Sequence, residues 1–357
     1  MTAEYYWTLP TRGGGRGVAD PSEKDGDWSP GGGALGPSIR DVRPGRYSYV
    51  DHLAHITRAA AVAGFSGVFV PFDPEGEDSW IVSAALAREI PRLAFVTEFP
   101  PTFGTPVYAA KMSATFQRFS GGRLGWKLAV EDDPAAGAAF GDHVEGADRF
   151  VRAGEFLDVA TGIWGQEGFT FKGRFFEVEE GGLRHPLSRY PRPPVTLSGA
   201  TPEALALSAT RGDLHLWESA RLHELEEYIL ELNRLASAHG RHLRHGVQLT
   251  VVARETAQEA WDEVRRLWLH AGVGDQEGFE RLVLAPELWS GFRTIGQHAT
   301  AGVVGSYEQV ASYLHRVGEA GVEVFYLGAN SPLEEAYRFG EHVVPLLVAP
   351  SPQLQAV

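Results

Sequence analysis

Short apolar runs alternate with longer amphipathic segments along most of the chain. Apolar runs of about four to eight residues are typical of buried strands, and periodic segments of about ten or more are typical of helices. Eight runs have the strand character: Tyr5–Leu9, Gly67–Pro71, Leu93–Glu98, Leu124–Ala129, Pro194–Ser198, Asp213–Trp217, Val247–Ala253 and Val322–Leu327. Eight segments have the helical pattern: Tyr49–Ala63, Ser79–Glu89, Pro106–Phe119, Asp148–Trp164, Pro202–Thr210, Leu222–His239, Tyr307–Ala320 and Glu334–Leu347. This alternation predicts a parallel (β/α)8 barrel of the TIM type.

Residues with defined backbone preferences mark several of the predicted helix ends. Gly64 and Gly321 each follow a helical pattern, where glycine accepts the left-handed geometry of a helix cap. Thr201 precedes Pro202, so threonine can cap a helix whose first turn contains proline. These signals support the predicted order of strands and helices.

Two insertions and an irregular loop interrupt this order. Phe169–Val178 predicts a β-hairpin outside the barrel, with Lys172 and Gly173 at its turn, within an insertion of about residues 165–192. Residues 271–302 form a long insertion that is a candidate lid, although such a segment can also be structural or disordered. Gly13–Gly45 is rich in Gly, Pro and Asp and predicts an irregular loop. We therefore expect one barrel domain over residues 1–350 and a tail over 351–357.

Composition and charge narrow the classes of partner. The 357 residues are 43% hydrophobic and 22% charged, as in ordinary globular proteins. The formal net charge of -14 argues against nucleic acid and anionic lipid as partners. The absence of cysteine excludes disulfides, thiolate metal ligands and a cysteine nucleophile. With no leader-like segment and no long apolar stretch, we expect a cytoplasmic protein that does not enter a membrane.

Several short motifs, each weak alone, occur in the order found in one enzyme family. The motifs are Leu9–Thr11, Glu77–Trp80, Phe119–Leu124, Pro193–Pro194, Ser198–Thr201, Val304–Ser306 and Leu333–Arg338. Together they resemble the luciferase-like flavin-dependent monooxygenases, and most closely the alkanesulfonate monooxygenase branch. The matches run from Leu9 to Leu347, which is nearly the whole chain.

The resemblance implies reduced FMN (FMNH2) as cofactor, O2 as co-substrate and a small organic substrate. It also implies a separate NAD(P)H:flavin reductase and assembly into homodimers or homotetramers. A dinucleotide site within this chain has little support. The glycine cluster Gly13–Gly17 leads into more loop rather than a helix and lacks the G-x-G-x-x-G spacing.

A set of residues at strand ends matches the family's cofactor site. Ser198, Gly199, Ala200 and Thr201 lie between a strand and a helix, where backbone N–H groups and the helix dipole can hold a phosphate; an ordinary helix cap is the alternative.

Lys127, Glu131 and Phe150 depart from the family pattern of the cofactor site. Lys127 stands near the position of a family asparagine, and Phe150 replaces a tyrosine whose hydroxyl reaches the phosphate. A buried Lys127 needs a carboxylate, for which Glu98 and Glu131 are candidates. Lys127 can instead face the flavin, or close a salt bridge in a barrel that no longer holds flavin.

The family's substrate site is altered further. The matching positions carry Arg12 for a histidine, Gly76 for a cysteine, Gln248 and Thr250 for an Arg and a His, Gly296 near a lid arginine, and Asn330 for a tyrosine. Loss of two arginines removes the bidentate grip suited to a sulfonate. We therefore expect a neutral or amphipathic organic substrate, with Gly76, Gln248, Thr250 and Gly296 in its site.

Three residues are candidates for catalysis. Arg12, after the first strand, can hold a substrate carboxylate or stabilise negative charge on oxygen, or it can be a solvated loop residue. His215 can act as an acid or base, although a lone strand histidine is more often a hydrogen-bonded core residue. Asn330 follows the last strand. Trp217 can wall the substrate or ring slot, or belong to the core.

Two other functional interpretations remain open. The changes at Lys127, Glu131 and Phe150 also fit a diverged barrel that has lost flavin and serves as a partner subunit or a flavin-free enzyme. A third possibility is the deazaflavin F420. We expect no metal site, and we interpret His239, His242 and His245, beside arginines at a helix end, as facing solvent.

Overall fold

The computed structural model describes residues 3–12, 49–102, 104–130, 134–185, 187–218 and 221–348. The predicted loop Gly13–Gly45, Glu131 and the predicted tail lie outside the described residues. None of the helices in these ranges is long and apolar enough to cross a membrane.

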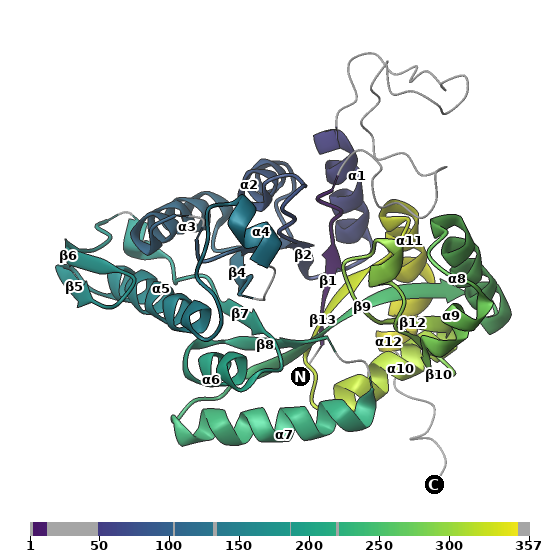
Figure 1. The fold of residues 1–357 in the computed structure, drawn as a ribbon. Helices are drawn as coiled ribbons and strands as arrows, with labels where there is room; N and C mark the ends of the chain where they lie inside the picture. Colours follow the sequence, from purple (N-terminus) through teal and green to yellow (C-terminus); the bar gives the residue numbers. More distant parts are fainter. Residues whose placement is uncertain are drawn as a thin grey trace, which may run out of the picture.

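Eight parallel strands form a closed ring, which confirms the predicted (β/α)8 barrel (Figure 1). Around the ring the strands are β1 (Glu4–Thr8), β2 (Gly67–Val70), β3 (Ala94–Phe99), β4 (Leu124–Leu128), β7 (Val195–Ser198), β8 (Leu214–Trp217), β9 (Arg244–Arg254) and β13 (Val324–Gly328). The ring closes because β8 pairs with β9, β9 with β13 and β13 with β1. Each of the eight predicted runs contains or overlaps one of these strands.

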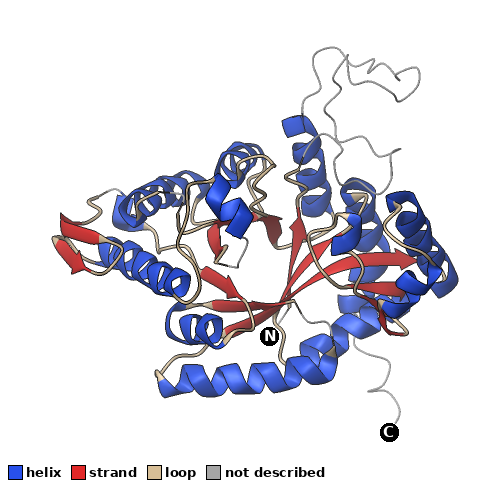
Figure 2. Cartoon of the chain, in the orientation of Figure 1, coloured by secondary structure: helices blue, strands red, loops and turns tan. Residues whose placement is uncertain are grey.

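Helices cover the outside of the ring (Figure 2). They are α1 (Tyr49–Val62), α2 (Ser79–Glu89), α3 (Pro106–Ser120), α4 (Pro134–Ala139), α5 (Asp148–Gly165), α6 (Pro202–Arg211), α7 (Leu222–Ala238), α8 (Ala257–Ala271), α10 (Tyr307–Glu319), and the consecutive α11 (Pro332–Arg338), η3 (Phe339–Val343) and α12 (Val344–Val348). Gly64 and Gly321 have φ of 86° and 106°, as the helix-end signals require. The Thr201 side chain accepts a hydrogen bond from Ala204 N, which confirms the cap of α6.

Two additions lie outside the ring. β5 (Phe169–Lys172) and β6 (Glu177–Gly181) form the predicted hairpin, which packs against α5. The insertion folds into α9 (Gln276–Arg281), β10 (Val283–Ala285), β11 (Leu288–Trp289) and the short turn η2 (Arg293–Ile295), and then joins β12 (Gly302–Ser306). β12 pairs with the second half of β9, because β9 continues beyond the ring to Arg254. The insertion packs through Phe279, Trp289 and Phe292 into an apolar cluster that it shares with α8 and β9.

The interior of the ring is filled at one level and polar at the next. Tyr6, Phe69 and Tyr326 belong to one buried cluster with apolar residues from other strands. Side chains on a strand alternate between the two faces, so residues two positions further along point inward again. At that level Glu98, Lys127 and Gln248 are buried polar residues. The aromatic layer thus closes the barrel below a polar layer near the carboxyl ends of the strands.

Candidate active site

A cavity of about 1080 Å³ opens at the carboxyl ends of the barrel strands. Its walls come from the ends of β1, β2, β3, β4, β9 and β13 and from the segment that follows η2. This is the face on which TIM-barrel enzymes carry their active sites. Seven of the residues expected at the site line the cavity: Arg12, Glu98, Lys127, Gln248, Thr250, Gly296 and Asn330. The other eight do not line it: Gly76, Phe150, Ser198, Gly199, Ala200, Thr201, His215 and Trp217.

A buried ion pair forms part of the cavity wall. Glu98 and Lys127 are directly opposite each other on β3 and β4. Lys127 Nζ lies 2.5 Å from Glu98 Oε1, while Glu98 Oε2 accepts a hydrogen bond from Phe72 N at 2.9 Å. Glu131, the other candidate carboxylate, lies outside the described residues, and Glu98 is the one that contacts Lys127. It also holds the start of the loop that follows β2.

His298, which the sequence analysis did not single out, approaches this pair from the insertion. Its Nε2 lies 3.9 Å from Glu98 Oε2, and its ring lies 5.5 Å from that of Phe69. Burial lowers the pKa of His298, and the charge of Glu98 opposes that shift. The imidazole is therefore neutral near pH 7 and can accept a proton at the cavity surface.

Arg12 lines the cavity, but its charge is already balanced. Its guanidinium donates two hydrogen bonds of 2.8 Å to the carboxylate of Asp73, and this contact raises the pKa of Arg12. Gly76 lies in the same loop as Asp73. The two loops are in close contact at this glycine, since a Cβ there would lie 2.8 Å from the carbonyl oxygen of Thr11. Arg12 thus joins the loops that follow β1 and β2.

Two amide side chains on the wall formed by β9 and β13 have donors without partners. Gln248 is 4% exposed, and its Nε2 has no hydrogen-bond partner among the described residues. Asn330 Oδ1 accepts a hydrogen bond from Gln297 Nε2 at 3.0 Å, but Asn330 Nδ2 has no partner there either. Buried donors are nearly always satisfied in native proteins. These two amides are therefore the strongest indication of a ligand in the cavity.

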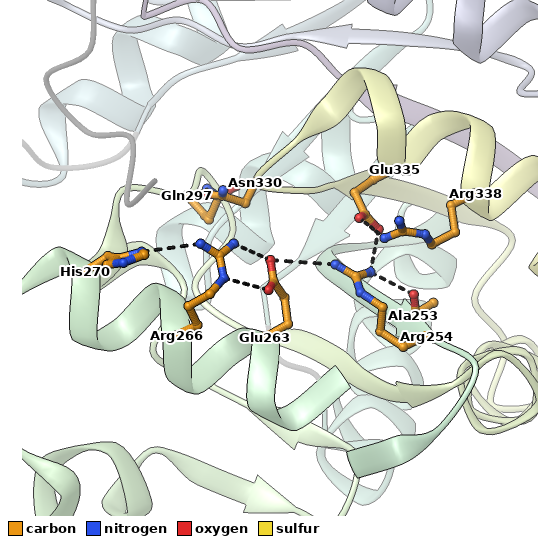
Figure 3. A network of polar contacts seen from close by, with 9 residues as sticks. All are labelled: Ala253, Arg254, Glu263, Arg266, His270, Gln297, Asn330, Glu335 and Arg338. Atoms are coloured by element: carbon orange, nitrogen blue, oxygen red, sulfur yellow. Dashed lines mark hydrogen bonds and ion pairs between the residues drawn. The ribbon is translucent and has the colours of Figure 1, made fainter. Parts of the chain in front are cut away.

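A charged network joins the end of β9 to the helices α8 and α11 (Figure 3). Arg254, at the end of β9, contacts Glu335 of α11 at 3.0 Å and Glu263 of α8 at 3.7 Å. Glu263 also forms an ion pair with Arg266, and Glu335 forms one with Arg338. The network ties α8 and α11 to the end of the strand that carries Gln248 and Thr250.

Arginines of α5 lie on another wall, next to the end of β4. Arg149 lines the cavity and donates to the carbonyl oxygen of Val130 at 2.9 Å. Arg152 donates two hydrogen bonds to Asp142, which lower the pKa of that carboxyl. Phe150 lies between these arginines in the sequence and packs against the main core, away from the cavity.

The turn between β7 and α6 lies outside the cavity lining. Gly199 has φ of 106°, and Thr201 Oγ1 accepts a hydrogen bond of 3.3 Å from Ala204 N. The turn therefore forms the capped N-terminus of α6, where backbone N–H groups are exposed at the helix end. The Ser198–Thr201 segment does not line the cavity, whereas Glu98, Lys127 and Gln248 of the polar layer do.

His215 and Trp217 face the helices rather than the cavity. Leu214 and Leu216 point into the barrel, so the alternate residues of β8 point outward. His215 Nδ1 lies 2.8 Å from Ser208 Oγ of α6, and Trp217 Nε1 donates to His245 Nδ1 at 3.3 Å. His245 is 3% exposed, so its expected exposure to solvent was wrong. Its place on β9 opposite His215 explains the burial.

Comparison with known proteins identifies the class of this barrel. The family model for luciferase-like monooxygenases matches residues 33–324. The chain therefore belongs to the luciferase-like monooxygenase family, a family of oxidoreductases.

Three solved structures share the architecture over nearly the full length. EDTA monooxygenase (EmoA) from Chelativorans sp. BNC1 is 18% identical, with a TM-score of 0.74 and coverage of 100% of this chain and 95% of that chain. Riboflavin lyase (RcaE), with modified FMN and substrate riboflavin, is 18% identical, with a TM-score of 0.71 and coverage of 97% and 91%. An F420-dependent secondary alcohol dehydrogenase, in complex with an F420–acetone adduct, is 19% identical, with a TM-score of 0.68 and coverage of 98% and 100%. These likenesses support the fold, and the alkanesulfonate branch stays a prediction.

Proposed function

We propose that this protein is a monooxygenase that uses reduced FMN and O2 to oxidise a small organic substrate. The observation that carries the proposal is the cavity at the carboxyl ends of the strands, with the buried Lys127–Glu98 pair on one wall and the unsatisfied Gln248 amide on another. Membership of the luciferase-like family supports the reaction class. Similarity to structures that carry FMN or F420 leaves the choice of cofactor to the residues of this chain.

The described residues fit a flavin in size and charge. Pockets for single organic ligands measure about 300–1,000 Å³, so a cavity of about 1080 Å³ has room for a flavin and a small substrate. Arg149 would meet the phosphate on the wall next to β4. The N-terminus of α6, with Ser198 and Thr201, would add backbone donors where the cofactor leaves the cavity. Phe150 cannot contribute a hydroxyl.

Bound reduced FMN would supply the two electrons with which O2 gives one oxygen atom to the substrate and one to water. The chain supplies the surroundings. Lys127 holds a fixed positive charge at the cavity wall, where it can stabilise negative charge that develops on oxygen. His298 can hold or pass a proton at Nε2, with Glu98 beside it. Because this chain shows no nucleotide motif for NAD(P)H, a separate reductase would deliver the reduced flavin.

The balance of charges in the cavity bears on the substrate. Arg12 is held by Asp73, and Gln248 stands where the alkanesulfonate enzymes have an arginine. Among the described residues a bidentate cationic site for a sulfonate is therefore missing, which favours a neutral or amphipathic substrate.

A flavin-free barrel is the competing function, and two positions favour it. Lys127 is satisfied by Glu98 without any ligand, and the Ser198–Thr201 turn does not line the cavity. In that case the ion pair closes the space that a flavin ring would occupy.

Anaerobic titration with a ligand panel tests the proposal. The panel contains reduced FMN, oxidised FMN, and reduced and oxidised F420, each followed by absorbance and by tryptophan fluorescence. We expect reduced FMN to bind at micromolar concentrations and more tightly than either form of F420. Tighter binding of F420 would replace FMN in the proposal. No binding of any of the four at high micromolar concentrations would leave the flavin-free barrel.

A further inference from the structure

The Gln248 amide is buried without satisfying its own hydrogen-bonding needs. It lies on β9 inside the ring, is 4% exposed and lines the cavity, and its Nε2 has no partner among the described residues. A buried donor without a partner destabilises a protein. Gln117 shows the usual solution in this fold: its Nε2 donates to Pro191 O at 3.1 Å, and its Oε1 accepts from Leu124 N at 3.0 Å. Because the Gln248 side chain lines the cavity, a ligand bound there is the natural source of the missing acceptor.

A second donor faces the same wall from the neighbouring strand. β13 pairs with β9 so that Tyr326 is opposite Gln248 and Gly328 is opposite Thr250. Asn330 follows two residues after Gly328, and its Nδ2 also lacks a partner among the described residues. Its Oδ1 is held by Gln297, so the amide has a defined orientation. One unsatisfied N–H donor on β9 and another just after β13 thus indicate an acceptor group on the ligand.

Among the described residues, the cations around this wall are already paired or lie away from it. Arg12 is paired with Asp73, Lys127 with Glu98, and Arg293 with Glu218. Arg152 is paired with Asp142, and Arg149 follows β4, which is not a neighbour of β9 in the ring. An anionic group at Gln248 would therefore be desolvated without a cation of its own. A neutral acceptor meets no such penalty.

We propose that Gln248 and Asn330 form a subsite for a neutral carbonyl group of the substrate, as in an amide, lactam, ester or ketone. The Gln248 amide N–H would bind the carbonyl oxygen, with the Asn330 amide further along the same cavity lining. The subsite would discriminate against carboxylates and sulfonates. This inference rests on the proposed function in one respect: it takes the ligand of the subsite to be the substrate. The recognition chemistry of the subsite follows from the unsatisfied donors and the paired cations.

Thermal unfolding of two leucine variants provides the first test. Gln248→Leu removes an unsatisfied donor, so the midpoint of unfolding should stay the same or rise by about 2–4 °C. The matched Gln117→Leu variant should lower the midpoint, because it leaves Leu124 N and Pro191 O without their hydrogen-bond partner. A fall for Gln248→Leu as large as that for Gln117→Leu would give Gln248 a structural role and overturn the proposal.

Binding of three matched probes provides the second test, by saturation-transfer-difference NMR with hexanamide, hexanoate and hexylamine. Hexanamide should bind, its signal should fall at least tenfold in Gln248→Leu, and hexanoate should give no comparable signal. Hexanoate or hexylamine binding as well as hexanamide, or no hexanamide signal, would overturn the subsite.

The affinity for reduced FMN shows whether Gln248 belongs to the substrate subsite or to the cofactor site. This affinity should be the same in wild type and Gln248→Leu, and a tenfold loss would assign the amide to the cofactor and overturn the proposal. If wild type binds hexanamide through Gln248 but no flavin, the monooxygenase proposal fails and the carbonyl subsite stands.

Discussion

The carboxylate of Glu98 and the ammonium group of Lys127 form an ion pair across β3 and β4 in which the two side chains are only 5% and 4% exposed. Removing two charges from water costs several kcal/mol for each ion, and their attraction recovers this only with good geometry and further hydrogen bonds. Here Phe72 N supplies one such bond to Glu98. The pair is therefore sensitive to the loss of either member.

We expect Lys127→Met to lower the free energy of unfolding by about 3–5 kcal/mol, because it leaves the Glu98 charge buried and uncompensated. The double variant Glu98→Gln with Lys127→Met should recover most of that loss, since no isolated charge remains. Urea unfolding followed by circular dichroism measures both changes.

The exposed pair Lys172–Glu177 on the hairpin is the control. Lys172→Gln should change the free energy of unfolding by no more than about 1 kcal/mol. A single variant Lys127→Met that is as stable as wild type would show that the ion pair is not held as described.

His245 should make the stability depend on pH in the mildly acidic range. Burial lowers its pKa to about 4, from 6.5 in the unfolded chain, and the neighbouring His242 adds to the shift. Between these two values the unfolded chain binds the proton more readily than the folded protein does. This contribution therefore leaves stability intact above pH 6.5 and removes about 3 kcal/mol as the pH falls to 4.

Urea unfolding at a series of pH values measures this effect as the difference between wild type and His245→Gln. The wild type should lose more stability between pH 6.5 and 4 than the variant does. His239→Gln, at an exposed helix end, should keep the wild-type dependence. Parallel curves for wild type and His245→Gln would contradict the buried neutral imidazole.

His298 should titrate below the usual range of a histidine, because burial lowers its pKa. Glu98 opposes that shift, so Glu98→Gln should lower the pKa of His298 further. Proton NMR titration of the imidazole resonances, assigned by comparison with His298→Gln, measures both. An unchanged or raised pKa in Glu98→Gln would show that the carboxylate does not act on this ring.

The barrel strands could be predicted because each is a compact apolar run. The direction of their side chains could not be predicted, because the same runs are apolar on both faces. In β8, Leu214 and Leu216 point inward while His215 and Trp217 point outward. A four-residue run buried on both sides lacks the alternation that would assign His215 to a face. The sequence therefore leaves both the acid–base role and the core position open for His215.

Site residues could be predicted where they lie at the end of a barrel strand. They could not be predicted where they lie in the insertion. Lys127 and Glu98 occupy equivalent ends of adjacent strands, so the need for a carboxylate led to Glu98 as one of two candidate partners. His298 lies in the insertion, whose path depends on the packing of Trp289 and Phe292. The length of β9 and its pairing with β12 likewise have no local signal, because tertiary pairing decides where a long strand ends.

Arg149 should distinguish FMN from riboflavin if it meets the cofactor phosphate as proposed. Reduced riboflavin has the same ring system but no phosphate, so wild type should bind reduced FMN more tightly than reduced riboflavin. Arg149→Met should reduce this preference by at least tenfold and leave the affinity for reduced riboflavin nearly unchanged, since a charge-assisted hydrogen bond contributes about 1.5–3 kcal/mol. Anaerobic fluorescence titration of both ligands gives the two ratios, with the exposed Arg118→Met on α3 as control. An equal loss of affinity for both ligands in Arg149→Met would place the guanidinium at the ring or in the fold, and the phosphate contact would then have to come from the α6 N-terminus alone.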